Sequence, residues 1–341
     1  MKGRQIALDH LNGREAAALM VDGRLHDLLV DADLPRPGTI YRAIANRPMK
    51  GQGGMFVTTP DGNAFLRQIK GLSPGQAILV QVTGYAEPGK AIPVTARILF
   101  KSRFAIITPD APGFNVSRSI RDDETRDALL AIAHEEMTGS EMGLILRSAC
   151  DGADPTEIAD DIRAMHDLAQ AVLADAGGNE AEKLTDGDGP HTLAWRDWSD
   201  PADVVTEDGS FEALGILDQI DALSSDHIPL PGGASMYVEP TRALIAVDVN
   251  TGNDSSPAAG LKVNSSAAKD LPRQLRLRGL GGQITLDLAP MAKKDRKNFE
   301  ATVRSAFRTD QVETALVGWT PLGHYELQRK RDRIPLKELM K

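Results

Sequence analysis

The stretch ALIAVDVNTG, residues 243–252, indicates how the C-terminal third of this chain folds. Its small and β-branched apolar residues predict a buried strand. The strand ends in Asp248 and Asn250, which the two-residue period of a strand places on one face. We therefore expect a carboxylate and an amide that point in the same direction from the end of a buried strand.

A second predicted strand, GGQITLDLAPM (281–291), also ends in an acid, Asp287. The chain between the two strands is long enough for a helical crossover, which would set the strands parallel and adjacent. Asp248 and Asp287 would then lie at the carboxyl ends of neighbouring strands, where open α/β sheets place their sites. The glycines of GLGG (279–282) close a helix and precede a strand. Because a dinucleotide-binding fingerprint has the reverse order, we exclude a nucleotide-cofactor enzyme.

The acid pair has two interpretations. Two close carboxylates repel unless a cation lies between them, so Asp248 and Asp287 could bind Mg²⁺, with Asn250 orienting Asp248. Alternatively, both are strand-end aspartates that accept hydrogen bonds from loop N–H groups. The connecting helix carries three arginines: Arg273, Arg276 and Arg278. Guanidinium groups bind phosphate in a bidentate manner, so these arginines and the basic run QRKRDR (328–333) favour a metal site that acts on a phosphodiester.

The composition is that of a globular protein, with 41% hydrophobic and 26% charged residues among 341. This length predicts two to four structural units. The sequence shows no signal peptide and no apolar run that could span a bilayer, so we expect a cytoplasmic protein without a membrane partner. Cys150 is the only cysteine, which excludes an internal disulfide and a zinc site with several cysteines from one chain.

The net charge of −9 is unevenly distributed along the chain. Residues 151–226 carry 3 basic and 20 acidic residues, whereas residues 227–341 carry 18 basic and 12 acidic ones. The basic end indicates a polyanionic partner, or alternatively a solvated face. The acidic segment 177–226 shows no pattern to which we can assign chemistry.

The hydrophobic pattern predicts a fold of the α/β plus β class. Residues 1–34 predict strands, and five short runs between residues 38 and 109 indicate a small barrel of the OB type. These runs are GGMFVTT, NAFLRQI, AILVQVTGY, IPVTARILF and RFAIITP. Further on, we expect helices over residues 119–142 and 156–176 with the strand GLILRSA between them, an α/β pattern from residue 229, and a charged helix over 292–309.

Taken in order, ALIAVDVNTG, RQLRLRGLGGQITLDLAPM and GWTPLGHYELQRKR (318–331) resemble the catalytic core of the ribonuclease E/G family. The β-rich segment is similar to the OB-type RNA-binding module of that family, and Phe56 and Phe65 stand where the family stacks bases. Without this resemblance, each is equally an aromatic of a barrel core. GLILRSA resembles the family's sensor for an RNA 5′ monophosphate, with Arg147 and Ser148 in place of Arg-Thr. The alternative for Arg147 is an arginine at a strand end that faces solvent.

The resemblance implies a metal-dependent endoribonuclease that cleaves single-stranded RNA in RNA processing or decay and leaves a 5′ phosphate and a 3′ hydroxyl. Its partner would be single-stranded RNA, including RNA with a 5′ monophosphate. By position, Asp248 and Asp287 would hold Mg²⁺, with Asn250 as support. The implied regions are a reduced ribonuclease-H-like region (1–35 with 166–226), an OB-type module (36–109), a 5′-end sensor-like region (110–165) and a deoxyribonuclease-like catalytic unit (227–341).

Several features depart from the family pattern. No Cys-rich zinc-link motif follows the core, so we do not expect a zinc-linked tetramer, whereas a homodimer remains open. Pro272 is expected to kink the connecting helix or to begin it. Arg242 replaces the acidic residue usual in relatives. These departures leave an alternative function open, namely an RNA-binding protein of the same architecture that no longer cleaves RNA.

Overall fold

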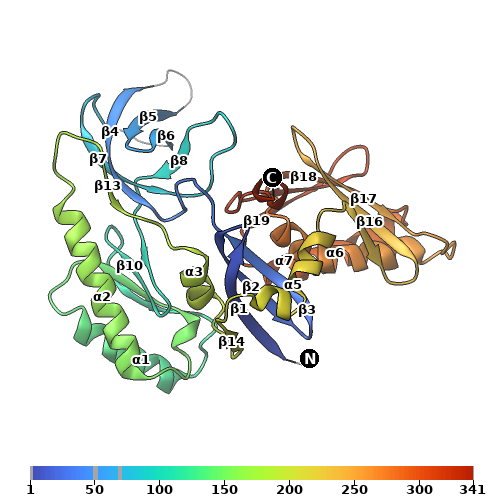
Figure 1. The fold of residues 1–341 in the computed structure, drawn as a ribbon, viewed down its shortest axis with the longest axis horizontal. Helices are drawn as coiled ribbons and strands as arrows, with labels where there is room; N and C mark the ends of the chain where they lie inside the picture. Colours follow the sequence, from blue (N-terminus) through green and yellow to red (C-terminus); the bar gives the residue numbers. More distant parts are fainter. Residues whose placement is uncertain (1–2, 49–52, 68–70, 341) are drawn as a thin grey trace. The chain divides into compact units, whose positions relative to one another are not determined.

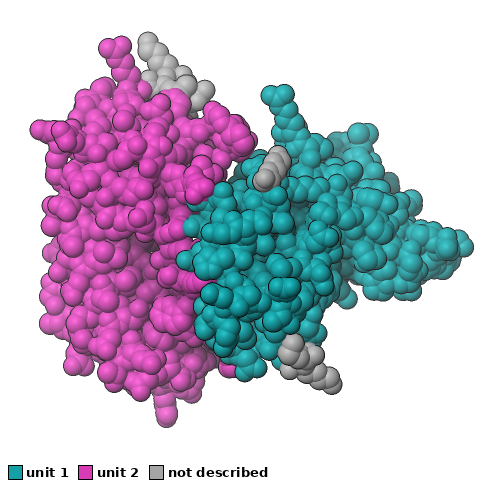
Figure 2. Space-filling view, in the orientation of Figure 1, with its two compact units in different colours: residues 1–32, 202–341 teal, residues 33–201 magenta. Residues whose placement is uncertain are grey.

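The computed structural model describes the chain in three stretches: residues 3–48, 53–67 and 71–340. It divides into two compact units, which Figure 2 shows in different colours. Unit 1 combines residues 1–32 with residues 202–341, and unit 2 spans residues 33–201. Unit 2 is therefore an insertion between two segments that fold together. The acidic segment 177–226 is divided between the two units.

Unit 2 contains a closed barrel of five strands, consistent with an OB-type fold (Figure 1). The strands run in the order β4 (Ile40–Pro48), β5 (Gly54–Thr59), β6 (Gly62–Arg67), β8 (Ile92–Thr95) and β7 (Ala77–Val82). Pairing of β4 with β7 closes the barrel. Alternate residues of the strands fill the interior, as the period of two requires. Tyr41, Val57, Leu66 and Val80 are among these buried residues.

The membership of the barrel differs from the sequence prediction in one strand. The run RFAIITP forms β10 (Ala105–Thr108), which belongs to another sheet, and β4 takes the expected fifth place. β4 is long enough to pair with both β5 and β7, so it can close the ring. β10 pairs with β9 and β12 instead, and its buried Ala105 and Ile107 pack in a different core.

The rest of unit 2 is a small α/β layer. Its sheet has the order β11 (Phe114–Val116), β12 (Gly143–Leu146), β10 and β9 (Phe100–Lys101). Two helices, α1 (Asp123–Glu136) and α2 (Pro155–Ala174), pack against this sheet and against each other. Asp122 and Asp154 cap these helices by accepting N–H groups of their first turns, which explains where each helix begins. The remaining elements are η1 (Ser148–Cys150), β13 (Glu182–Thr185) and α3 (Pro190–Asp197).

Unit 1 begins with an antiparallel meander of β1 (Arg4–Leu11), β2 (Arg14–Val21) and β3 (Arg24–Val30). β14 (Asp203–Val205) joins this sheet from the acidic segment and pairs in parallel with β1. Two short helices, α4 (Ser210–Ala213) and α5 (Ile216–Ala222), contribute Phe211, Ile216 and Ile220 to the core of the meander.

The second sheet of unit 1 carries the conspicuous acids of the sequence. We call it the C-terminal sheet; its order is β15 (His227–Leu230), β16 (Ala234–Pro240), β17 (Ile245–Asn250), β18 (Gly282–Asp287), β20 (Tyr325–Arg329) and β19 (Thr314–Trp319). Its helices are α6 (Ala259–Leu277), η2 (Lys293–Asp295), α7 (Arg296–Arg308) and α8 (Leu336–Leu339). The apolar side chains of α6 and α7 form one core with the sheet, and Figure 1 shows both helices beside it. The apolar residues of each strand face this core, whereas the alternate residues point to the opposite face.

Helix α6 connects the two acid-bearing strands and runs through Pro272, which neither begins nor ends it. Proline removes one backbone donor, but Leu271 and Leu275 on either side are buried in the core of the sheet. Packing therefore keeps this turn helical. The helix ends in a Schellman motif, with Leu280 N–H bonded to Leu275 O and the left-handed Gly279 N–H bonded to Arg276 O. The GLGG glycines thus close a helix, as expected.

None of the helices in the described part of the chain is long and apolar enough to cross a bilayer.

Candidate active site

The two acids of the sequence motif face each other across neighbouring strands. β17 and β18 are parallel, and Asp248 lies directly opposite Asp287 in their register. Both residues are exposed, whereas Val247, Val249 and Leu286 beside them are buried. The carboxylates therefore occupy the face of the sheet opposite α6 and α7. The sequence prediction of adjacent parallel strands that end in acids is confirmed.

Two further side chains support the acid pair. Asn250 Nδ2 donates a hydrogen bond to Asp248 Oδ2 at 2.7 Å, which is the orienting contact that the sequence predicted. His324 Nδ1 lies 3.4 Å from Asp287 Oδ1. Sequence reasoning missed His324, although the residue lies inside the GWTPLGHYELQRKR block. It reaches Asp287 because Tyr325, the next residue, pairs with Leu286.

The donor set of this pair fits a hard divalent cation. Adjacent strands lie about 4.8 Å apart, so the two carboxylates repel each other at short range. Within the described stretches, neither Asp248 nor Asp287 forms an ion pair with a lysine or arginine, and neither accepts a backbone N–H. Carboxylate oxygens in this arrangement are ligands that Mg²⁺ accepts together with water and phosphate oxygens. Asp248 and Asp287 would be the residues that hold the ion.

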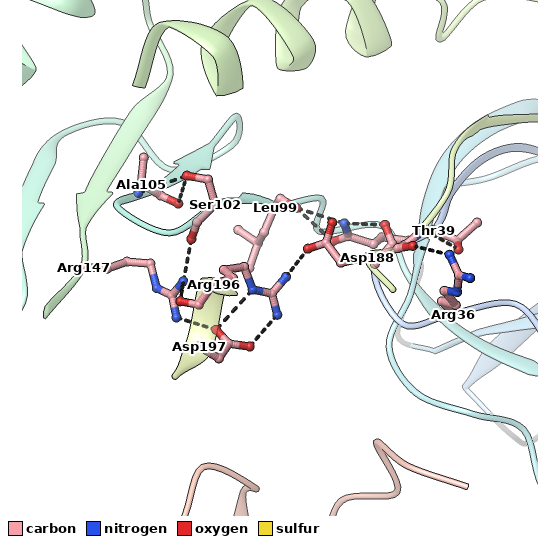
Figure 3. A network of polar contacts seen from close by, with 12 residues as sticks. Arg36, Thr39, Leu99, Ser102, Ala105, Arg147, Asp188, Arg196 and Asp197 are labelled. Carbon is pink, nitrogen blue, oxygen red and sulfur yellow. Dashed lines mark hydrogen bonds and ion pairs between the residues drawn. The ribbon is translucent and has the colours of Figure 1, made fainter. Parts of the chain in front are cut away.

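Arg147 follows β12 directly and belongs to a polar network in unit 2 (Figure 3). Its Nη1 donates to the carbonyls of Ser102 and Arg196, and its Nη2 donates to Asp197 Oδ1 at 2.7 Å. Arg196 binds the same Asp197 and also reaches Asp188 at 2.6 Å. Burial alone would raise the pKa of Asp197, but the guanidinium groups of Arg196 and Arg147 hold this pKa below its usual range.

These contacts fix the position of the Arg147 guanidinium but do not occupy all of its N–H donors. A guanidinium has five N–H donors, and the contacts to residues that the structure describes occupy three. The Arg147 side chain is 25% exposed, so it is neither buried nor a freely solvated strand end. Ser148 begins η1 and is exposed. An arginine fork next to an exposed hydroxyl is compatible with a terminal phosphate ligand.

Phe56 and Phe65 lie side by side on the outside of the barrel. They are a cross-strand pair of β5 and β6, and their rings meet edge to face with centroids 5.3 Å apart. Both are half-buried, whereas Val57 and Leu66 next to them fill the interior. A Cβ at Gly54 would lie 2.5 Å from the Phe65 ring, so this ring rests on a strand position without a side chain. Neither phenylalanine belongs to the barrel core.

A comparison with protein families matches the part of the chain that carries the acid pair and Arg147. The model of the ribonuclease E/G family matches residues 100–202 and 196–332, which include both acid-bearing strands and Arg147. The chain belongs to the ribonuclease E/G family.

Curated relatives have the same family names. Ribonuclease E of Nostoc sp. is 25% identical over 382 residues, which cover 95% of this chain and 56% of the relative. Ribonuclease G of Escherichia coli K12 is 25% identical over 305 residues, which cover 78% of this chain and 62% of that protein. Ribonuclease G of Haemophilus influenzae is 24% identical over 386 residues, which cover 95% of this chain and 78% of that protein. The chain thus spans little more than half the length of the first two relatives.

Three arginines that the sequence assigned to RNA binding in this ribonuclease E/G family member are engaged in internal contacts: Arg273, Arg276 and Arg278. Arg276 and Arg278 are only 7% and 6% exposed. Arg276 pairs with Asp310, Arg273 pairs with Asp270 at 2.8 Å, and Arg278 donates to Gln274 and to Ser225 O. The helix that carries them is buried on several sides, because residues of α6 belong to the cores of both sheets of unit 1. We therefore leave these arginines out of the RNA-binding surface proposed below.

Two other groups could suggest metal chemistry. Ligand atoms of Asp9, His10 and Asp208 lie within 4.8 Å of one another. Asp9 already accepts the Phe211 N–H at 2.9 Å and so anchors α4 on β1, a structural role that explains its position. Cys150 is buried, and burial raises the pKa of its thiol to about 12, which does not favour a zinc-binding thiolate. We assign a metal to neither group.

Proposed function

We propose that this chain is a metal-dependent endoribonuclease that hydrolyses single-stranded RNA to products with a 5′ phosphate and a 3′ hydroxyl. The observation that carries the proposal is the register that sets Asp248 opposite Asp287 on an exposed sheet face, with Asn250 bonded to Asp248. Family membership supports it, since curated relatives are named Ribonuclease E and Ribonuclease G. The proposed chemistry is hydrolysis of a phosphodiester.

Each residue of the site has a defined task in this proposal. Asp248 and Asp287 hold the ion, and Asn250 fixes the orientation of the Asp248 carboxylate through its 2.7 Å hydrogen bond. His324 restricts the rotation of Asp287 from the other side. A bound Mg²⁺ would lower the pKa of a water ligand and neutralise charge on the scissile phosphate. The exposed sheet face leaves room for a polymer to approach the two acids.

The other regions supply RNA contacts in this proposal. The barrel of the OB-type module (36–109) would grip single-stranded RNA through Phe56 and Phe65. The region 110–165, with Arg147 and Ser148, would bind a 5′ monophosphate, while residues 227–341 form the catalytic unit. Residues 1–35 with 166–226 would be the reduced ribonuclease-H-like region. We propose a cytoplasmic enzyme.

The decisive experiment is incubation of the purified, EDTA-treated protein with a single-stranded RNA oligonucleotide that carries a 5′ monophosphate. We expect cleavage to return when Mg²⁺ is added, with a 5′ phosphate on the downstream product. Tight RNA binding without cleavage at any Mg²⁺ concentration would instead support the alternative, a non-cleaving RNA-binding protein of this architecture.

Truncating the aromatic pair of the barrel should weaken RNA binding. Stacking of a base on an aromatic side chain contributes about 1–3 kcal/mol, so Phe56→Ala or Phe65→Ala should each raise the Kd for single-stranded RNA about 5- to 150-fold. Fluorescence anisotropy with a labelled oligonucleotide measures this change. Val57→Ala is the matched variant, because its side chain is fully buried in the same strand. It should lower the melting temperature and leave the Kd largely unchanged; equal Kd values for all three variants would refute the stacking role.

Removing Arg147 should abolish a preference for a 5′ phosphate. Hydrogen bonds to a charged group contribute about 1.5–3 kcal/mol, so wild type should cleave a 5′-monophosphorylated substrate at least about tenfold faster than its 5′-hydroxyl counterpart. Arg147→Ala should cleave both at the same rate. Arg163→Ala is the control, since Arg163 is an exposed, ion-paired arginine of the same unit. A wild type without preference, or an Arg147→Ala variant that keeps it, would show that Arg147 has only a structural role.

A further inference from the structure

A row of polar and aromatic side chains crosses the exposed face of the C-terminal sheet at the level of the acid pair. It follows the strand register from His227 to Tyr237, from Tyr237 to Asp248, and from Asp248 to Asp287. His324 continues the row beyond Asp287, next to the paired Leu286 and Tyr325. Four neighbouring strands and the residue that directly precedes β20 thus contribute one side chain each to a single line, and we call it the active-face row.

The first two members of the active-face row form an exposed aromatic pair. Tyr237 is 37% exposed, and His227 is exposed as well. Their rings are tilted by 54° with centroids 5.0 Å apart. The residues beside them, Ile228, Met236 and Val238, supply the buried contacts of these strands. The two rings therefore do not contribute to the core, and core packing does not explain their position on the solvent face.

The position of Tyr237 relative to the acids suggests what the aromatic pair contacts. Tyr237 and Asp248 are direct cross-strand partners in an antiparallel pair. Side chains of such partners have Cβ atoms about 5 Å apart, so a group lying on the Tyr237 ring is within one strand spacing of the Asp248 carboxylate. Next to a negatively charged carboxylate, a neutral flat group is accommodated more readily than an anionic one.

We propose that Tyr237, backed by His227, is a stacking platform for the nucleobase adjacent to the scissile phosphate. The proposal rests on the proposed function, because it assigns a substrate position at the same site. Aromatic rings hold single-stranded bases through their π faces, with little dependence on base identity. With the base held on Tyr237, the adjoining phosphodiester lies along the active-face row at Asp248 and Asp287. The row thus fixes where along the RNA the acids act.

Stacking can be observed directly with oligoribonucleotides in which 2-aminopurine replaces one base at a time, because fluorescence of this base responds to stacking. Wild-type protein stripped with EDTA should bind such RNA without cutting it. We expect a fluorescence change at the position next to the bond that is cut when Mg²⁺ is restored. Tyr237→Ala should abolish the change there, and Tyr237→Phe, which keeps the ring, should retain it. His227→Ala should reduce it.

Cleavage kinetics provide the second readout. Loss of one base-stacking contact should lower kcat/KM about 5- to 150-fold in Tyr237→Ala, and Tyr237→Phe should restore most of this loss. Val317→Ala serves as the control, because Val317 is an exposed apolar residue at the far edge of the same sheet. Circular dichroism should show the same fold for all variants, since Tyr237 contributes no core contact.

The outcomes separate the platform from the proposed function. If wild type cleaves RNA but Tyr237→Ala changes neither the 2-aminopurine signal nor kcat/KM, the platform is refuted and the nuclease assignment stands. If wild type binds RNA with a Tyr237-dependent signal but never cleaves, the nuclease assignment fails and the base-binding site stands. Loss of signal in both Tyr237→Ala and Tyr237→Phe would also overturn stacking, because it would assign the effect to the hydroxyl.

Discussion

Asp248→Asn and Asp287→Asn are each expected to lower the rate of RNA cleavage at least about a thousandfold while RNA binding persists. A metal ion in a hydrolytic site contributes several kcal/mol of transition-state stabilisation, and each 1.36 kcal/mol corresponds to about a factor of ten in rate. Asparagine keeps the size of the side chain but removes the negative charge that attracts the cation. Single-turnover cleavage at saturating Mg²⁺ measures the rate, and anisotropy measures binding.

Two further substitutions calibrate this result. Asn250→Ala removes an orienting hydrogen bond rather than a ligand, and such changes cost about 10- to 100-fold in activity. Glu239→Gln is the matched control, because Glu239 is an exposed carboxylate on the same sheet that pairs with Ala246 instead of an acid. It should cleave like wild type. Full activity of Asp248→Asn or Asp287→Asn would exclude the acid pair as the metal site.

The largest expected effect on stability is at Asp310, whose side chain is fully buried in unit 1. Its carboxylate binds the guanidinium groups of Arg276 and Arg329, and the side chain of Arg329 is only 1% exposed. Removing one partner of a buried ion pair leaves an uncompensated charge and costs about 3–5 kcal/mol. Asp310→Ala should therefore lower the free energy of unfolding by about that amount. Urea denaturation followed by circular dichroism measures the loss.

An exposed ion pair provides the comparison. Asp160 pairs with Arg163, and their side chains are 65% and 55% exposed. Solvent screens such pairs, so Asp160→Ala should change the free energy of unfolding by at most about 1 kcal/mol. If Asp310→Ala were as mild as Asp160→Ala, the buried network around Arg276 would not hold unit 1 together.

The acid pair could be predicted because its geometry follows from local pattern and chain connectivity. The alternation in ALIAVDVNTG determines the face of Asp248 and Asn250, and a right-handed helical crossover sets the next strand parallel beside it. The barrel could be predicted for the same reason. Which strand closed it could not, because RFAIITP has the apolar pattern of a strand, whereas polar residues interrupt that pattern in β4. Only the pairing of β4 with both β5 and β7 distinguishes them.

The local sequence pattern could not predict the contacts of the α6 arginines or the neighbours of the acid pair. In the sequence, Arg276 has the pattern of a basic residue that faces solvent on a charged helix. Its partner Asp310, however, comes from the segment between α7 and β19, which is distant in sequence. His324 and Tyr237 reach the acids only through strand pairings that bring β20 and β16 beside β18 and β17. Short-range periodicity carries no information about such partners.

The sequence by itself determined the family, the two acid-bearing strands and the face on which Asp248, Asn250 and Asp287 point. The tertiary structure alone decided what surrounds them, including the exposed Tyr237, the contact of His324 with Asp287 and the burial of Arg276 and Arg278. The physical reason is the range of the forces involved. Side-chain direction repeats every two residues in a strand and about every 3.6 in a helix, so the local sequence determines it. Burial and charge pairing instead depend on remote segments that meet only in the folded chain.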